Sequence, residues 1–211
     1  YESQISARDH DGLIYFDVKS TTLFYHGKPS GVLIIARDST ERKRTEEQIR
    51  LLAIVDTLTG LFNRRGFITL AEQQLKTAYR TEKKQLLFFI DLDGLKVIND
   101  TYGHDEGDHA LQKTAMILKQ TFRESDIIGR LGGDEFAVLV VDDDELQKNI
   151  LKRLKERIKE ESTVSDVSYK ISMSIGVAEY DPSRPCKVEE LMLEADRLMY
   201  IQKKEKKQAG G

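Results

Sequence analysis

The sequence predicts an α/β protein with a mixed central sheet flanked by helices, preceded by a short N-terminal β segment and a linker helix. From Asp56 onward, apolar residues recur alternately at helical spacing and in short strand-like runs. One run, Leu86–Ile90, is continuously apolar, which is typical of a central strand buried on both faces. A Gly-Gly pair also separates two apolar runs within residues 127–141, and this pattern indicates a tight hairpin.

The first 38 residues have strand and turn signals. We expect strands at 13–18, 22–25 and 31–36, with a turn at 26–29 before the last of them. Three strands without a helix make a poor independent core. We therefore expect residues 1–38 to be the C-terminal strands of a larger domain, and the opening at Tyr1 without a Met is typical of a fragment.

Residues 39–55 change character and read STERKRTEEQIRLLAIV. Ser39 or Thr40 is suited to cap a helix start, and Ile49, Leu52 and Val55 form a narrow apolar stripe on a charged helix. The stripe leaves two interpretations open, a solvated spacer and a two-stranded coiled coil.

The remaining residues, 56–211, alternate between helix and strand patterns. The expected elements are a helix at 67–78, a strand at 86–90, a helix at 111–122, the hairpin at 127–141, a helix at 146–158, a strand at 171–177 and a final helix at 188–199. This order predicts one α/β domain around a mixed sheet.

Composition excludes several classes of protein. The net charge of -3 provides no electrostatic footprint for nucleic acid. Cys186 is the single cysteine, so no intrachain disulfide can form, and a reducing, cytoplasmic location is expected. The apolar runs are far shorter than the roughly 20 residues that span a bilayer, so no membrane segment is expected in this chain. Attachment of a longer parent protein to a membrane stays open.

Acidic residues occur where the predicted central strand ends and at the tip of the predicted hairpin. Asp91 ends the buried strand, and Asp134 and Glu135 occupy the hairpin tip. If the hairpin pairs with the central strand, these carboxylates converge, and they repel one another unless a cation lies among them. Hard oxygen ligands favour Mg²⁺ or Mn²⁺. The alternative is that each acid merely accepts hydrogen bonds from turn N–H groups.

The segment KVINDTYGHDEGD, residues 96–108, carries groups that suit a nucleotide. Lys96 is suited to phosphate, and Asn99 with Asp108 complements the hydrogen-bonding edge of guanine. The same residue types are common in loops and helix caps, and spacing alone favours that simpler interpretation.

Two further pairs of charged residues each have two interpretations. Lys203 and Lys207 are four residues apart on the last helix, and either form a phosphate clamp or a charged, fraying helix end. Arg123 and Asp126 lie just before the hairpin, where they form either an ion pair or a site for a guanine edge or phosphate.

Five motifs occur in the order found in one known family. They are DTLTGLFNRRGF at 56–67, FFIDLDGLKVINDTYGHDEGD at 88–108, RESDIIGRLGGDEF at 123–136, SMSIGVAEY at 172–180 and EADRLMYIQKK at 194–204. Residues 56–207 thus resemble the GGDEF family of diguanylate cyclases, whose fold is similar to the palm of nucleotidyl cyclases and polymerases. Residues 1–38 and the following RDSTERKRTEEQI resemble, less specifically, the end of a PAS sensor domain and its signalling helix.

The resemblance implies a function and a set of site residues. Two GTP molecules would be joined into cyclic di-GMP with release of two pyrophosphates, on a homodimer with one GTP in each domain. Asp91, the Leu92 carbonyl, Asp134 and Glu135 would bind Mg²⁺ (or Mn²⁺), with Asp134 as proton acceptor. The substrate would contact Lys96, Asn99, His104, Asp108, Lys203 and Lys207. Arg123 and Asp126 would form an inhibitory site for the product.

Departures from the family pattern define the alternatives. Gly94-Leu95 replaces a common aromatic pair, and Lys206-Lys207-Gln208 stands where Gly-Arg-Asn is frequent, so Lys207 lacks the planar fork of arginine. A catalytically inactive module that binds GTP or cyclic di-GMP would be expected to have a broken signature, whereas Asp91, Asp134 and Glu135 are all present. A cyclase that tolerates adenine would lack Asp108. A mere sensor and dimerisation module is not supported by residues 1–38 alone.

Overall fold

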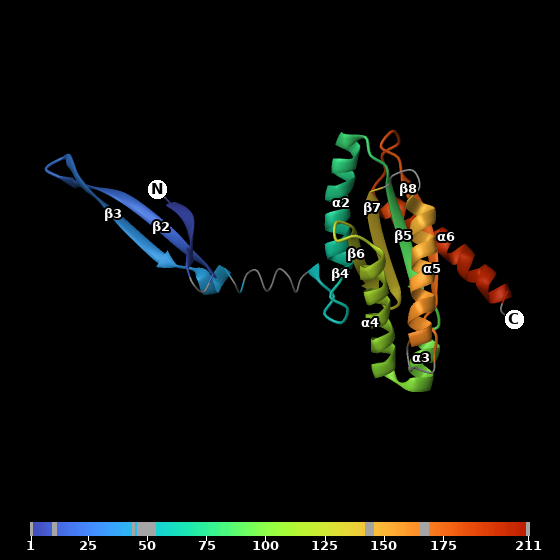
Figure 1. Cartoon of the computed structure of the whole chain (residues 1–211). Coiled ribbons are helices and arrows are strands. Elements are labelled where there is room, and N and C mark those ends of the chain that lie inside the picture. Colours follow the sequence, from blue (N-terminus) through green and yellow to red (C-terminus); the bar gives the residue numbers. More distant parts are fainter. Residues whose placement is uncertain are drawn as a thin grey trace. The chain divides into compact units, whose positions relative to one another are not determined.

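The computed structural model describes residues 2–9, 12–43, 45, 54–141, 146–164 and 169–209. The chain divides into two compact units, Tyr1–Leu52 and Ala53–Gly211 (Figure 1). Ile49 and Leu52 of the predicted linker stripe lie outside the described residues, so the coiled coil stays a prediction. The assignment of 1–38 to a sensor domain stays a prediction as well.

The first unit is a three-stranded antiparallel sheet in the order β1-β2-β3. Its strands are β1 (Glu2–Asp9), β2 (Gly12–Tyr25) and β3 (Lys28–Asp38). Two strands were expected within 13–25, but β2 is continuous because Ser20 and Thr21 pair with Ile34 and Leu33. The third strand of the sheet is instead β1, which was not predicted.

Helical structure begins after β3, as expected. Residues 40–43 are helical, and the Lys43 N–H donates to the Ser39 carbonyl at 2.9 Å. The first turn is attached to β2 because the Arg42 guanidinium donates to Asp17 at 2.7 Å. Val55 forms a β-bridge with Phe62, so the predicted helix does not extend to Val55.

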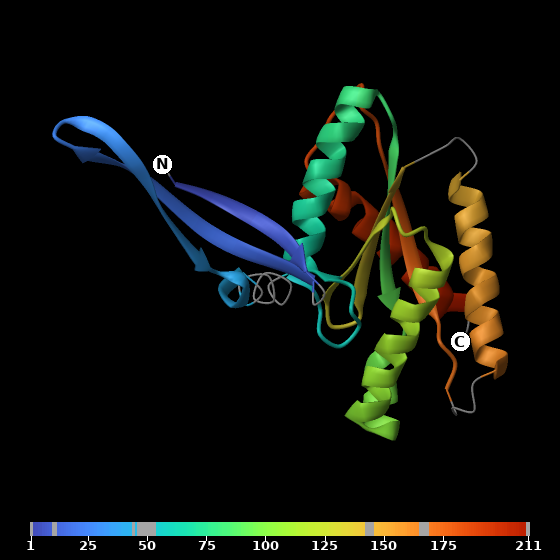
Figure 2. The ribbon, with the colours of Figure 1, turned by 60° about the vertical axis from the view of Figure 1, so that its left-hand side comes forward.

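The second unit contains a five-stranded mixed sheet in the order β4-β6-β7-β5-β8 (Figure 2). The strands are β4 (Phe62–Asn63), β5 (Gln85–Leu92), β6 (Ile127–Gly132), β7 (Glu135–Val141) and β8 (Met173–Tyr180). β4 pairs parallel to β6, and the other pairings are antiparallel. The predicted hairpin and mixed sheet are confirmed.

Helices cover both faces of this sheet. They are α2 (Arg64–Thr81), α3 (Leu95–Tyr102), α4 (His104–Thr121), α5 (Leu146–Val164) and α6 (Val188–Ala209). Phe88 and Ile90 of β5 pack with residues of α4 and α5, while Leu87 and Phe89 pack with α2 and α6. Every residue of β5 is buried, which confirms the predicted central strand. The fold class expected from the sequence, a mixed sheet flanked by helices, is therefore correct.

The α3–α4 helical pair was not predicted as such. Only Ile98 of α3 is buried, so this eight-residue helix has too short an apolar pattern to identify it. Gly94 precedes α3 with a φ of 77° and Gly103 separates the helices with a φ of 94°, conformations that suit glycine. Both views show α3 and α4 meeting at one end of the domain (Figures 1 and 2).

Candidate active site

The hairpin tip lies directly beside the end of the central strand. Asp91 of β5 is in register with Glu135 of β7, and the Leu92 N–H donates to the Asp134 carbonyl at 2.9 Å. This pairing confirms that Asp91, Asp134 and Glu135 lie together where β5 ends and β7 begins. We call these three carboxylates the acidic edge. Gly133, with a φ of 49°, supplies the left-handed turn between β6 and β7.

Arg130 fixes the shape of this turn. Its guanidinium donates to the Gly133 carbonyl at 3.0 and 2.8 Å and to the Asp56 carboxylate at 3.3 Å. Asp56 also accepts from the Thr59 N–H at 2.9 Å and the Thr59 hydroxyl at 2.6 Å. Burial alone would raise the pKa of Asp56, but the Thr59 hydrogen bonds and Arg130 together lower it. The sequence predicted no role for Arg130. The spacing of Asp56 and Thr59 is a turn signal, but it does not indicate that Arg130 binds Asp56.

Asp91 is the most buried member of the acidic edge. Its carboxylate accepts a hydrogen bond from the Lys203 ammonium at 2.6 Å, and its side chain is 10% exposed. Burial raises the pKa of Asp91, and the neighbouring charge of Asp134 adds to this against the opposing contact with Lys203. Burial would lower the pKa of Lys203, but Asp91, Asp134 and Asp93 together raise it. The neighbouring carboxylates contribute to both shifts, because one ammonium does not neutralise several carboxylates.

Glu135 shows the same excess of negative charge. Burial raises its pKa first, and the charges of Asp134, Asp196 and Asp91 raise it further against Arg64. Such an edge favours the binding of a cation.

The donor set fits Mg²⁺ or Mn²⁺ in its chemistry. Within the described ranges, no group of three His, Cys, Asp or Glu side chains is arranged to hold a metal ion. Mg²⁺ does not need such a cage, since it is commonly bound by one or two carboxylates together with water and substrate phosphates. Asp91, Asp134 and the Leu92 carbonyl are oxygen donors of the kind that such a site uses.

Four of the predicted substrate-binding residues lie on the α3–α4 pair. Lys96 and Asn99 are on α3, and His104 and Asp108 are one turn apart on α4. Asn99 packs tightly against Gly107, where an added Cβ would lie 1.8 Å from the Asn99 Oδ1. Lys96 follows Leu92 by four residues, so the chain leads directly from the acidic edge to these groups.

The predicted inhibitory residues line a separate hollow. Arg123 and Asp126 form a turn in which the Arg123 N–H donates to the Asp126 carboxylate at 2.8 Å. A hollow of about 330 Å³ is lined by Gly60, Leu61, Phe62, Lys119, Arg123, Glu124, Asp126 and Ile128. Burial raises the pKa of Asp126 despite the Arg123 contact. Lys207, the remaining predicted phosphate ligand, has its side chain outside the described part of the structure.

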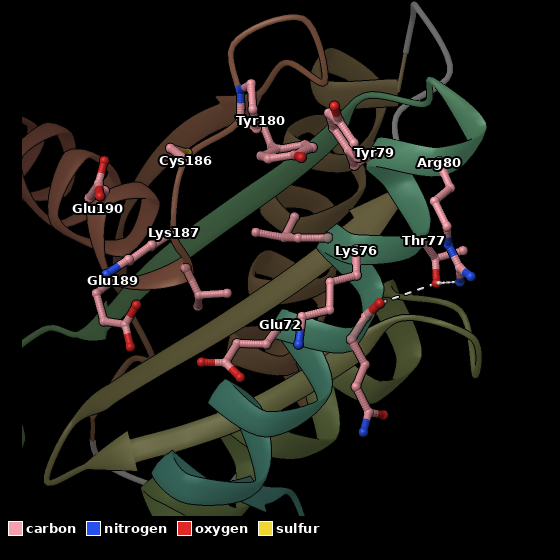
Figure 3. A pocket seen from close by; sticks show the side chains of 14 residues that line it. Glu72, Lys76, Thr77, Tyr79, Arg80, Tyr180, Cys186, Lys187, Glu189 and Glu190 are labelled. Atoms are coloured by element: carbon pink, nitrogen blue, oxygen red, sulfur yellow. Dashed lines mark hydrogen bonds between the residues drawn. The ribbon is translucent and has the colours of Figure 1, made fainter.

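A larger hollow lies between α2 and the segment that joins β8 to α6 (Figure 3). Its volume is about 1200 Å³, and its lining includes Leu75, Tyr180 and Val188 together with charged side chains of both signs. Lys76 of α2 and Glu189 of α6 are among the charged side chains that line it (Figure 3). None of the predicted site residues lines this hollow.

Carboxylates gathered at one place are the ligands by which many enzymes that act on phosphate esters hold a divalent metal. The family profile described as "Diguanylate cyclase, GGDEF domain" matches residues 53–209. The chain therefore belongs to the GGDEF family of diguanylate cyclase domains, as the motifs predicted.

Relatives support this assignment. The chain is 34% identical over 183 residues to the signaling protein YkoW of Bacillus subtilis, covering 83% of this chain and 22% of that protein. It is 37% identical over 163 residues to MucR of Pseudomonas aeruginosa, a bifunctional diguanylate cyclase/cyclic di-GMP phosphodiesterase, covering 77% and 24% respectively. It is 33% identical over 176 residues to the diguanylate cyclase DgcP of Escherichia coli, covering 82% and 51%. The chain thus spans only part of each of these proteins.

Solved structures agree on the fold. The coiled coil and GGDEF domain of DgcB from Caulobacter crescentus, in complex with c-di-GMP, matches with a TM-score of 0.69 at 27% identity, covering 78% of this chain and 88% of that one. The GGDEF domain of YfiN from Pseudomonas aeruginosa matches with a TM-score of 0.64 at 35% identity, covering 72% and 89%. Among the described residues, no helix has the length and apolar character needed to cross a membrane.

Proposed function

We propose that this chain is an active diguanylate cyclase, which condenses two GTP molecules into cyclic di-GMP and releases two pyrophosphates. The observation that carries the proposal is the acidic edge, where Asp91 lies opposite Glu135 and the Leu92 N–H binds the Asp134 carbonyl. The relatives named as diguanylate cyclases support the same activity. An inactive nucleotide-binding module is less well supported because Asp91, Asp134 and Glu135 are all retained.

The site residues divide the work of the reaction. Asp91, Asp134, Glu135 and the Leu92 carbonyl would hold Mg²⁺ or Mn²⁺, which when bound supplies Lewis-acid stabilisation of the α-phosphate. Asp134 accepts the proton of the attacking 3′-hydroxyl. Lys96, Lys203 and Lys207 neutralise phosphate charge, Asn99 and Asp108 hydrogen-bond guanine, and His104 lines the substrate site.

Regulation and assembly are further parts of this proposal. Arg123 and Asp126 hold the product as an inhibitor in the hollow that also contains Lys119, which supplies a second positive charge. Each domain holds one GTP, and two domains face each other so that each 3′-hydroxyl attacks the α-phosphate of the other nucleotide in line. The N-terminal unit and the linker adjust this pairing as a PAS-like sensor in the cytoplasm.

The decisive experiment incubates the full chain with GTP and Mg²⁺ and identifies the product by mass spectrometry. We expect cyclic di-GMP and pyrophosphate. Asp134→Asn is the matched negative control, because the main-chain bond from Leu92 does not depend on the side chain. Its turnover is expected to fall at least about a hundredfold with an unchanged melting temperature. Production of cyclic di-GMP by Asp134→Asn at the parent rate would remove Asp134 from the chemistry.

A further inference from the structure

A second polar cluster lies two residues beyond Asp91, and none of its members has a role in the proposed chemistry. The Asp93 carboxylate accepts hydrogen bonds from the Ser172 hydroxyl at 2.7 Å, the Ser174 hydroxyl at 2.7 Å and the Lys206 ammonium at 2.9 Å. Lys206 also donates to the Met173 carbonyl. The cluster thus joins the end of β5, the start of β8 and the last turns of α6.

The C-terminal part of α6 depends on such contacts for its position. Among the side chains of α6 that the structure describes, Met199 is the last that is buried, and the following Tyr200 and Ile201 are 54% and 46% exposed. Beyond Met199, the helix is therefore not held by the apolar core. Polar side chains attach it instead, through Gln202, whose amide oxygen accepts from the Ile175 N–H at 2.6 Å, and through Lys203 and Lys206.

Lys206 is the last of these attachments along the helix. It lies three residues after Lys203, so the two ammonium groups share one side of α6. Each meets a carboxylate of the same strand end, Lys203 at Asp91 and Lys206 at Asp93. The Asp93 carboxylate is itself fixed by two serine hydroxyls, and Ser174 is fully buried. Lys206 therefore binds a rigid acceptor rather than a mobile surface acid.

We propose that Lys206, held by Asp93, is a positioning residue that fixes the last turns of α6 and so keeps Lys203 at the acidic edge. Its effect on turnover rests on the proposed function, because Lys203 is there assigned to the triphosphate. Its effect on the order of α6 does not depend on that function. A glycine at position 206, as is frequent in the family pattern, could not make this contact. The ion pair with Asp93 is therefore expected only in chains that have lysine or arginine at this position.

Lys206→Gln tests the proposal against Lys204→Gln as a matched control. Lys204 lies on the same helix, and its ammonium is 4.5 Å from the centre of the Tyr200 ring rather than at Asp93. Each variant removes one positive charge, so the two differ only in the contact that is lost. We expect Lys206→Gln to raise the KM for GTP about twofold to fivefold, the range of a partly exposed ion pair, with kcat changed by less than about twofold. Lys206→Arg should restore the KM. The dissociation constant of 3′-deoxy-GTP, which lacks the attacking hydroxyl, should shift as the KM does.

Two further measurements separate positioning from a simple loss of positive charge. If Lys206 acts through Asp93, the effects of Asp93→Asn and Lys206→Gln on the KM should not add in the double variant, because most of what Lys206 contributes is already lost with the Asp93 carboxylate. Amide hydrogen exchange in the nucleotide-free full chain should become faster over residues 203–209 in Lys206→Gln and not in Lys204→Gln.

Each outcome has a distinct meaning. Equal KM values and equal exchange for the two glutamine variants, with an active parent, would overturn the positioning role while leaving the proposed function intact. If the parent makes no cyclic di-GMP, the proposed function fails, and the exchange comparison still decides whether Lys206 orders the end of α6.

Discussion

β3 and β5 are built from similar residues but have opposite environments. β3 carries Val32–Ile35, four consecutive aliphatic residues, and each is at least 44% exposed. β5 carries Leu86–Ile90, and each is at most 6% exposed. The difference lies in what covers the strands, since helices pack on both faces of β5 within its unit and no residue of β3 is buried. Apolar composition therefore predicts that a strand needs cover, but the cover itself comes from elements elsewhere in the chain.

The largest expected effect comes from removing one large side chain in each strand. Phe88 is fully buried and stacks edge-on against Phe122, with ring centroids 5.4 Å apart. Phe88→Ala should lower the free energy of unfolding by about 3–5 kcal/mol. Ile34 is 64% exposed, so Ile34→Ala should lower the free energy of unfolding by less than about 0.5 kcal/mol.

Urea unfolding, monitored separately for each unit, measures both values. If Phe88→Ala does not fold, the milder Phe88→Leu should still cost about 1 kcal/mol. Equal losses for Phe88→Ala and Ile34→Ala would contradict the difference in cover between the two sheets.

Glycines extend the comparison to backbone packing. A Cβ at Gly176 of β8 would lie 1.9 Å from the Ala195 carbonyl oxygen and 2.3 Å from the Met199 nitrogen, so α6 would have to move. Gly176→Ala should therefore cost about 1–3 kcal/mol of stability. Gly31→Ala in β3 meets open space and should be neutral or slightly stabilising. The melting temperatures of the two variants distinguish close packing from strand propensity, because the change from Gly to Ala is the same in both. An unchanged melting temperature for Gly176→Ala would contradict the tight contact between α6 and β8.

Gly107 is a tightly packed glycine within the candidate site. A Cβ at this position would lie 2.9 Å from the Asn99 Cγ, in addition to its overlap with the amide oxygen. Gly107→Ala should displace the Asn99 amide and raise the KM for GTP about tenfold, because small misplacements of binding groups are costly. Steady-state kinetics with GTP measures the shift. An unchanged KM, with the fold intact, would mean that Asn99 does not contact the base.

The smallest expected effect concerns charge. The pKa of Glu135 is raised in the folded protein, so ionisation of Glu135 opposes folding. Glu135→Gln should raise stability at pH 7 by less than about 0.5 kcal/mol, because solvent screens the repulsion at this partly exposed side chain. The gain should shrink as the pH falls through the raised pKa of folded Glu135, and it should be absent below the ordinary glutamate value of 4.5, where both states are protonated.

Melting temperatures at pH 7 and pH 4 measure this change, with Glu205→Gln on the exposed side of α6 as the control. Mg²⁺ should stabilise the parent more than Glu135→Gln. A stabilisation by Glu135→Gln that persists unchanged at low pH would assign the effect to something other than the carboxylate.

The sequence predicted the parts of the fold that rest on local patterns. The β5 strand follows from its continuous apolar run, and the hairpin follows from Gly132-Gly133. α3 was not predicted because one buried residue makes no periodic pattern, and β1 was not predicted because its residues alternate weakly. The break expected inside β2 was wrong because cross-strand pairing with β3, which no local window contains, extends the strand through Ser20.

The candidate site shows the same limit. The acidic edge was predicted because one pairing, hairpin to central strand, brings Asp91 and Asp134 together. The Arg130–Asp56 contact joins residues 74 positions apart, and the Lys206–Asp93 contact joins residues 113 apart. Neither pairing follows from spacing, since both depend on how whole elements pack.

The bond between the Leu92 N–H and the Asp134 carbonyl has an evolutionary consequence. The position of residue 134 is set through a main-chain carbonyl, a group that every amino acid supplies. An aspartate codon becomes an asparagine codon by one base change, so a single mutation could silence the chemistry while the hairpin kept its shape. Under the proposed function, such a domain would lose the reaction while it kept its fold and the residues assigned to the nucleotide.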